Sequence, residues 1–209
     1  METTKVDMVP EMVVIDREGD VILVLKDVEL RVSSKVLSLA SPVFKTMFGP
    51  SFVEGKSITS SSPSRITLTD DNPIAMVNLC NIIHYQTKSM PKQPDQPFLD
   101  QLAIVADKYD CIEALRSSTH MWLTTLEAEA ASVIEEEPST SIGKLLYPAY
   151  TFDCAIAFEK ITRSMVYYVG GTTSQESPTQ YQICPAIQAL LPEGLLGKLA
   201  VLSTLSPTY

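Results

Sequence analysis

Only two histidines, His84 and His120, occur among the 209 residues of the chain. Both lie in segments with helical spacing, and no Gly-x-Ser-x-Gly motif accompanies either of them. The sequence also contains no Gly-x-Gly-x-x-Gly fingerprint and no Gly-x-x-x-x-Gly-Lys-Ser/Thr phosphate loop. We therefore expect a protein that is not an enzyme, with no catalytic residue and no cofactor site. A hydrolase-type enzyme that uses one of the two histidines is the alternative.

Cysteine is also scarce, and its spacing excludes the usual metal motifs. The four cysteines are widely separated and form no Cys-x-x-Cys pair; they are Cys80, Cys111, Cys154 and Cys184. A structural zinc site needs clustered Cys and His ligands, which this spacing does not supply. We predict no metal site, and we interpret the cysteines as reduced and mostly buried thiols.

Basic residues and long apolar runs are the remaining deficits. The chain has 16 Lys and Arg against 25 Asp and Glu, a net charge of −9, which disfavours direct binding of nucleic acid. No stretch approaches the roughly 20 apolar residues of a membrane span, and residues 1–7 lack the apolar core of a signal peptide. We expect no membrane contact and a cytoplasmic or nuclear location.

The most informative stretch is 30–48, which predicts the end of a strand followed by two short helices. Ser33 or Ser34 can cap the first helix, because a serine hydroxyl accepts from a backbone N–H of the first turn. Ser41 and Pro42 restart the pattern, with serine as a cap and proline at the first helical position. Each helix has an apolar stripe, formed by Val36, Leu37, Leu39 and Ala40 and then by Val43, Phe44, Met47 and Phe48, with Gly49 placed to end the second helix.

Short strands surround this pair of helices. Runs rich in β-branched residues predict strands at 12–15 and 21–25, separated by a turn in which Gly19 is available for a positive φ. A strand at 30–32 completes a hairpin. A serine-rich loop over 49–65 contains Pro50 and Pro63, and a strand follows at 66–68.

The rest of the chain predicts mainly helices. Asn72 before Pro73 is a strong helix start. The first expected helix is 73–85, with Ile74, Val77, Cys80 or Leu79 and Ile83 on one face. A proline-rich loop follows over 86–97. The other expected helices are 98–109, 112–126, 141–152, 154–168 and 185–205. We interpret the acidic run 127–137 as a solvated helix end and linker, and Gly170–Gly171 as a helix terminator.

Three of these segments resemble BTB/POZ domains, particularly those of fungal proteins. They are 37–48, 66–73 and 102–109, which occur in the family's order. The resemblance covers 15–112 and departs at Ser33, where the family often has histidine. It implies an α+β fold, a small sheet flanked by short helices. We expect a flexible N-terminus over 1–11, the BTB/POZ domain over 12–112 and an all-helical C-terminal extension over 113–209.

The resemblance also implies how the protein acts. BTB domains self-associate through their first helices and an N-terminal segment, so we expect a homodimeric scaffold. The candidate interface residues are Met12, Val14, Val36, Leu39 and Val43. At each of these positions a place in the core of the monomer is an equally good explanation.

Two narrower functions are alternatives. Some family members are adaptors of cullin-based ubiquitin ligases, and they contact the cullin through a hydrophobic residue, any residue and glutamate. Phe52 and Glu54 match this pattern. An aromatic anchor with one charge is a reasonable hot spot, although an exposed loop glutamate explains Glu54 equally well. The other alternative is a transcriptional co-regulator, which would need a transcription factor as its DNA-binding partner.

Overall fold

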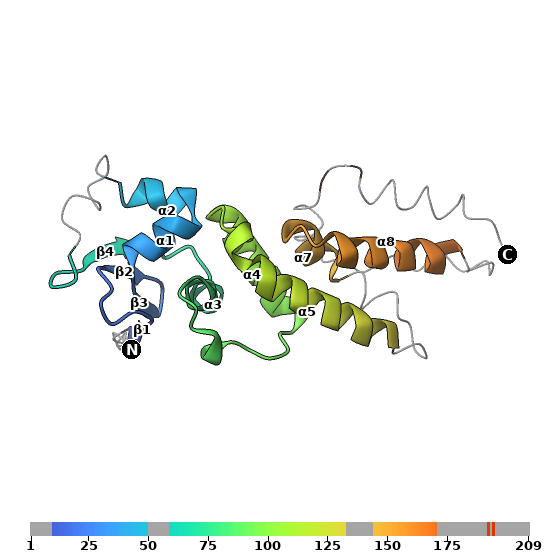
Figure 1. Ribbon diagram of the computed structural model, residues 1–209, viewed down its shortest axis with the longest axis horizontal. Helices are drawn as coiled ribbons and strands as arrows, with labels where there is room; N and C mark the ends of the chain where they lie inside the picture. The colour runs from blue at the N-terminus through green and yellow to red at the C-terminus, as the bar shows by residue number, and fades with distance from the viewer. Residues whose placement is uncertain (1–9, 50–58, 133–143, 171–191, 193, 195–209) are drawn as a thin grey trace, which may run out of the picture. The chain divides into compact units, whose positions relative to one another are not determined.

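The computed structural model describes residues 10–49, 59–132, 144–170, 192 and 194 (Figure 1). The chain folds into two compact units. The first is formed by Met1–Lys92 with Ile104–Leu115, and the second by Gln93–Ala103 with Arg116–Tyr209. The first unit contains a small mixed sheet with short helices, and the second is helical where it is described. The α+β prediction is therefore confirmed.

Four strands form the sheet of the first unit. They are β1 (Glu11–Val14), β2 (Val21–Val24), β3 (Val28–Val32) and β4 (Ser64–Thr67), in the spatial order β1-β3-β2-β4. The predicted hairpin is the antiparallel pair β2–β3. The strand β1 pairs in parallel with β3 and not with β2, the next strand in the sequence. The strand β4 pairs in parallel with β2. Both β1 and β4 are thus edge strands.

The turn between β1 and β2 requires glycine for a reason that the sequence did not reveal. Gly19 does not adopt the positive φ that we expected. A Cβ at this position would lie 2.7 Å from the carbonyl oxygen of Val32 and 2.9 Å from that of Asp16. The glycine therefore provides space for a close backbone approach.

Two short helices follow β3, as predicted. The hydroxyl of Ser33 accepts from the backbone N–H of Val36 at the start of α1 (Ser34–Ala40). The hydroxyl of Ser41 accepts from the N–H of Phe44 across 3.0 Å at the start of α2 (Pro42–Met47). Figure 1 shows both helices above the sheet.

The helix α3 (Pro73–Ile83) begins where the sequence predicted, with the side chain of Asn72 as its cap. Its predicted apolar face is partly wrong. Ile74 is 70 % exposed. The helix packs against both α1 and β3, and most of its buried residues lie in its second half, away from Ile74. The buried residues are Ala75, Met76, Leu79, Cys80, Asn81, Ile82 and Ile83. A short helix η2 (Thr87–Ser89) interrupts the predicted loop 86–97.

Four further helices follow in the described part of the chain. They are α4 (Gln96–Lys108), α5 (Ile112–Ser132), α7 (Leu146–Thr151) and α8 (Ala155–Gly170), with bounds a few residues from those predicted. The helix expected over 185–205 lies outside the described residues. None of the described helices has the length and apolar character needed to cross a bilayer.

Part of the acidic run 127–137 is not solvated, which corrects our interpretation. Glu127 continues α5 and is only 8 % exposed. Its Oε2 accepts from Nζ of Lys160 on α8 across 2.9 Å. A buried carboxylate needs such a partner, and no local pattern around Glu127 predicts one that lies 33 residues further along the chain.

Candidate protein-interaction surface

The edge strand β1 exposes apolar side chains on one face. Met12 is 46 % exposed and Val14 is 51 % exposed. Residues two apart in a strand point to the same side, so the two side chains form a short apolar row. An edge strand also presents unpaired backbone groups on its outer side.

The helix α1 contributes a second apolar element to this part of the first unit. Leu37 is fully buried against the core, whereas Leu39 is 83 % exposed. Val36 lies between these extremes, and Val43 on α2 is likewise half-buried. The four-residue stripe that we predicted therefore divides, with Leu37 in the core and Leu39 at the surface.

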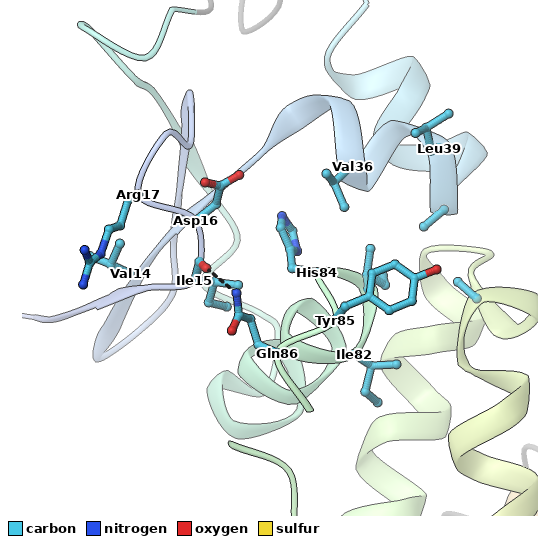
Figure 2. A pocket seen from close by; sticks show the side chains of 13 residues that line it. Val14, Ile15, Asp16, Arg17, Val36, Leu39, Ile82, His84, Tyr85 and Gln86 are labelled. Carbon is cyan, nitrogen blue, oxygen red and sulfur yellow. Dashed lines mark hydrogen bonds between the residues drawn. The ribbon is translucent and has the colours of Figure 1, made fainter. Parts of the chain in front are cut away.

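Three of the predicted interface residues, Val14, Val36 and Leu39, line one open hollow of about 850 Å³. Its floor is formed by the end of α3, and Figure 2 shows Tyr85 and Ile82 there, below Val36 and Leu39. Polar groups lie at one side, and Nε2 of Gln86 donates to the carbonyl oxygen of Ile15 across 3.4 Å. Met12 and Val43 do not line the hollow.

Tyr85 is a residue of this surface that we did not identify from the sequence. It is 87 % exposed and has a φ of 58°, in the left-handed region that favours glycine. The N–H of Tyr85 donates to the carbonyl oxygen of Ile82, and the N–H of Gln86 donates to that of Asn81. This pair of bonds is a Schellman motif, which places Tyr85 where helices most often have glycine.

Two other helices in the described part of the chain end in the same way, and both use aspartate. Asp110 after α4 has a φ of 46°, and Asp153 after α7 has a φ of 50°. Aspartate tolerates the left-handed region better than bulky residues do. Tyrosine at this position costs backbone energy and, being exposed, regains little from packing within the chain. Its presence favours a role at the surface.

His84 lies beside Tyr85 and has a structural role. Its Nε2 accepts from the backbone N–H of Ser33 across 3.1 Å. Its Nδ1 lies 2.8 Å from the carbonyl oxygen of Cys80 and therefore carries the proton. Burial is the main cause that lowers the pKa of His84. The neutral ring thus joins the start of α1 to the end of α3, and Figure 2 shows it pointing toward α1.

His120 belongs to the second unit, where it also binds backbone. Its Nε2 lies 3.1 Å from the carbonyl oxygen of Phe152. A mainly apolar hollow of about 470 Å³ is adjacent, with Met121 and Ile156 exposed on it. These three hydrogen bonds of the two histidines are all with backbone groups, and none of them pairs a histidine with a nucleophilic side chain.

The cysteines that the structure describes are buried free thiols, as predicted: Cys80, Cys111 and Cys154. Burial raises the pKa of Cys111 to about 12, so this thiol stays protonated near neutral pH. Cys184 lies outside the described residues. Within the described ranges, no group of three His, Cys, Asp or Glu side chains is placed to hold a metal ion.

The two residues of the predicted cullin contact, Phe52 and Glu54, lie outside the described residues, so the structure leaves that prediction as it was. Comparison with known families gives one finding. The family model of the BTB/POZ domain matches residues 16–126, slightly more than half of the chain. No curated protein matches the sequence.

Proposed function

The chain belongs to the BTB/POZ domain family, and on this basis we propose that it is a protein-interaction module that binds a second copy of itself. The BTB/POZ domain is a non-enzymatic interaction domain. We place the self-association on the surface formed by β1, α1 and the end of α3, which we call the β1–α1 surface. Its residues are Met12, Val14, Val36, Leu39 and Tyr85.

One observation carries this proposal. Of the eight large hydrophobic side chains that are exposed in the described part of the chain, Val14, Leu39 and Tyr85 line the same hollow. Single exposed apolar residues need no explanation, whereas a cluster of them marks a contact site. An aromatic side chain beside aliphatic ones is also the composition of an interface hot spot.

A two-fold symmetric contact suits this surface because it contains both a hollow and protruding apolar groups. In such a contact the same patch serves on both subunits, so a protruding side chain of one copy can enter the hollow of the other. The acidic net charge of −9 opposes association over a broad area, so we expect a compact apolar contact.

The test uses the full chain and two variants matched for exposure. Leu39→Asp introduces a charge at a position 83 % exposed, and Ile74→Asp does so at a position 70 % exposed outside the hollow. We expect a dimer by sedimentation velocity, weakened about 30-fold or more by Leu39→Asp and little changed by Ile74→Asp. A wild-type chain that stays monomeric, or equal weakening by both variants, would contradict the proposal.

The ligase-adaptor alternative makes a separate prediction. If Phe52 and Glu54 form the cullin contact, Glu54→Lys abolishes co-purification of a cullin while the dimer persists. Unchanged cullin binding in that variant refutes the site. Sequence-specific DNA binding by the purified chain alone would contradict the co-regulator alternative. Both alternatives fit the cytoplasmic or nuclear location that we propose.

A further inference from the structure

Four serines of the chain precede a proline, and one of them differs from the rest. They are Ser41, Ser62, Ser177 and Ser206. Only Ser62 has a basic residue three positions later, which is Arg65. The sequence Ser-Pro-Ser-Arg over 62–65 thus combines an acceptor hydroxyl, a following proline and a positive charge.

Ser62 is placed at an accessible corner of the first unit. It closes a tight turn with Thr59, whose carbonyl oxygen accepts from the N–H of Ser62 across 3.2 Å. Ser62 is exposed, and its hydroxyl has no hydrogen-bond partner among the described residues. Its reaction with an enzyme therefore costs no hydrogen bond to another described residue.

The residues after Ser62 are already extended. Ser64 and Arg65 begin β4, which lies at the edge of the sheet and pairs on one side with β2. The side chain of Arg65 is 52 % exposed, although it forms an ion pair with Glu29. An extended segment with an exposed guanidinium offers a charge pattern of the kind that kinases use to select substrates.

Ser41 provides an internal contrast because its Ser-Pro sequence serves the fold. Ser41 is 1 % exposed. Its hydroxyl donates to the carbonyl oxygen of Tyr109 across 2.5 Å and accepts from the N–H of Phe44. The hydroxyl of this buried serine both donates and accepts a hydrogen bond within the fold. Of the two Ser-Pro sequences in the described residues, only the one at Ser62 is therefore accessible.

We propose that Ser62 is a phosphorylation site for a proline-directed serine kinase. Proline at the next position has no backbone N–H, so a kinase pocket without an acceptor there leaves no donor unpaired. The Oγ of Ser62 attacks the γ-phosphorus of Mg-ATP, and a new oxygen–phosphorus bond forms. The bond from that phosphorus to the β–γ bridging oxygen breaks, ADP departs with the electron pair, and a carboxylate base of the kinase takes the hydroxyl proton.

The turn that carries Ser62 is held by an arginine. Nη2 of Arg31 donates to the carbonyl oxygen of Ser60 across 3.1 Å, and its Nε donates to that of Gly19 across 3.0 Å. The hydroxyl of Ser60 donates to the carbonyl oxygen of Glu18 across 2.8 Å. A phosphate adds about two negative charges to this turn, and its oxygens are strong acceptors for a guanidinium. Phosphorylation of Ser62 therefore changes the charge beside the hydrogen bonds that join this turn to Glu18 and Gly19, between β1 and β2.

The test is phosphorylation of the full chain by a purified cyclin-dependent kinase with Mg-ATP, followed by intact-mass and fragmentation mass spectrometry. We expect the wild type to carry phosphate on Ser62 and Ser62→Ala to lower incorporation about tenfold or more. Ser61→Ala, at a neighbouring exposed serine without a following proline, keeps the wild-type rate.

Two further variants examine the recognition itself. Arg65→Gln lowers the rate about tenfold, whereas Arg65→Lys, which retains the charge, stays close to wild type. Circular dichroism verifies that both variants are folded. Phosphate found only on Ser177 or Ser206, no incorporation at all, or an unchanged rate in Pro63→Ala would overturn the proposal.

Discussion

The hydroxyl of Tyr109 donates a hydrogen bond to Oδ2 of Asp71 across 2.7 Å, which ties the end of α4 to the turn before α3. Asp71 is 7 % exposed, and its Oδ1 accepts from Nζ of Lys108 across 2.7 Å. Burial, followed by this hydrogen bond, raises the pKa of Tyr109 above its usual range. The phenol therefore stays protonated, and remains a hydrogen-bond donor, at neutral and moderately alkaline pH.

Loss of this hydroxyl should destabilise the first unit. Tyr109→Phe leaves one oxygen of a buried carboxylate without its partner, and we expect the free energy of unfolding to fall by about 1–3 kcal/mol. Urea titration followed by circular dichroism measures the change. Tyr85→Phe is the matched control, because that hydroxyl is on a side chain 87 % exposed. Equal losses in the two variants would show that the bond contributes nothing.

The same junction shows how far the sequence could predict the fold. The three blocks that resemble BTB/POZ domains do meet: the ring of Phe44 stacks on that of Tyr109, with centroids 4.3 Å apart, and Tyr109 binds Asp71. Local signals such as the serine caps and Pro42 and Pro73 were also sufficient to predict helix starts. These signals depend on residues within one helical turn of each other, so they can be recognised without knowing the tertiary structure.

Features that depend on distant partners could not be predicted. The pairing of β1 with β3 follows from the arrangement of the whole sheet, and the burial of Glu127 depends on Lys160. In the candidate surface, periodicity placed Leu37 and Leu39 on one face, although one is buried and the other exposed. Tyr85 gave no signal, because a left-handed residue at a helix end is usually announced by glycine.

His84 should make the stability of the first unit depend on pH. Its folded-state pKa lies below the ordinary value of 6.5, so the fold favours the neutral ring. Protonation would place a hydrogen on Nε2, which faces the N–H of Ser33. The stability that the neutral ring contributes is therefore present above about pH 6.5 and is lost as the pH falls through the folded pKa.

The measurement is the melting temperature between pH 7.5 and pH 5. We expect the wild type to lose stability toward pH 5 and His84→Gln to show a smaller change over that range, because the glutamine does not titrate. His120→Gln is the control, in the second unit, and should retain the wild-type slope. A slope that survives in His84→Gln would rule out this histidine as its cause.

Asp100 should produce the opposite dependence in the second unit. Its side chain is buried, Oδ1 has no hydrogen-bond partner among the described residues, and Gln96 binds Oδ2. Burial raises the pKa of Asp100 from 3.8 to about 7. The folded state thus favours the protonated carboxyl, and stability is lost as the pH rises from about 4 toward 7 and is not regained above it.

Asp100→Asn removes this cost because the amide stays neutral. We expect the variant to melt above the wild type at pH 8, with the difference shrinking toward pH 4, as differential scanning calorimetry would show. Asp107→Asn, at an exposed position of the same helix, should behave like the wild type at both pH values. A constant difference between pH 4 and pH 8 would contradict the assignment.

The pair formed by Glu127 and Lys160 should contribute more than a neighbouring exposed pair. Side chains of Glu159 and Arg163 are 60 % and 79 % exposed, whereas that of Glu127 is 11 % exposed. Glu127→Gln should cost about 1–3 kcal/mol, and Glu159→Gln less than about 0.5 kcal/mol. Guanidinium unfolding of the full chain compares them, and equal values would mean that burial of Glu127 is immaterial.

Tyr85→Gly separates folding from association on the β1–α1 surface. Glycine adopts a φ of 58° without strain, and the exposed ring that is lost has little packing in the monomer. We expect the free energy of unfolding of the monomer to rise by between zero and about 1 kcal/mol, since the more flexible unfolded chain offsets part of the gain. Most truncations of an aromatic side chain destabilise, so this sign is itself informative.

The same variant should weaken the dimer. Removing a hot-spot aromatic costs about 2 kcal/mol or more, so the dissociation constant measured by sedimentation should rise about 30-fold. Asp110→Gly relieves an equivalent backbone position outside the hollow and should leave the dimer unchanged. A Tyr85→Gly chain that dimerises as tightly as the wild type would remove Tyr85 from the interface, because a strained and exposed tyrosine would then have no function in association.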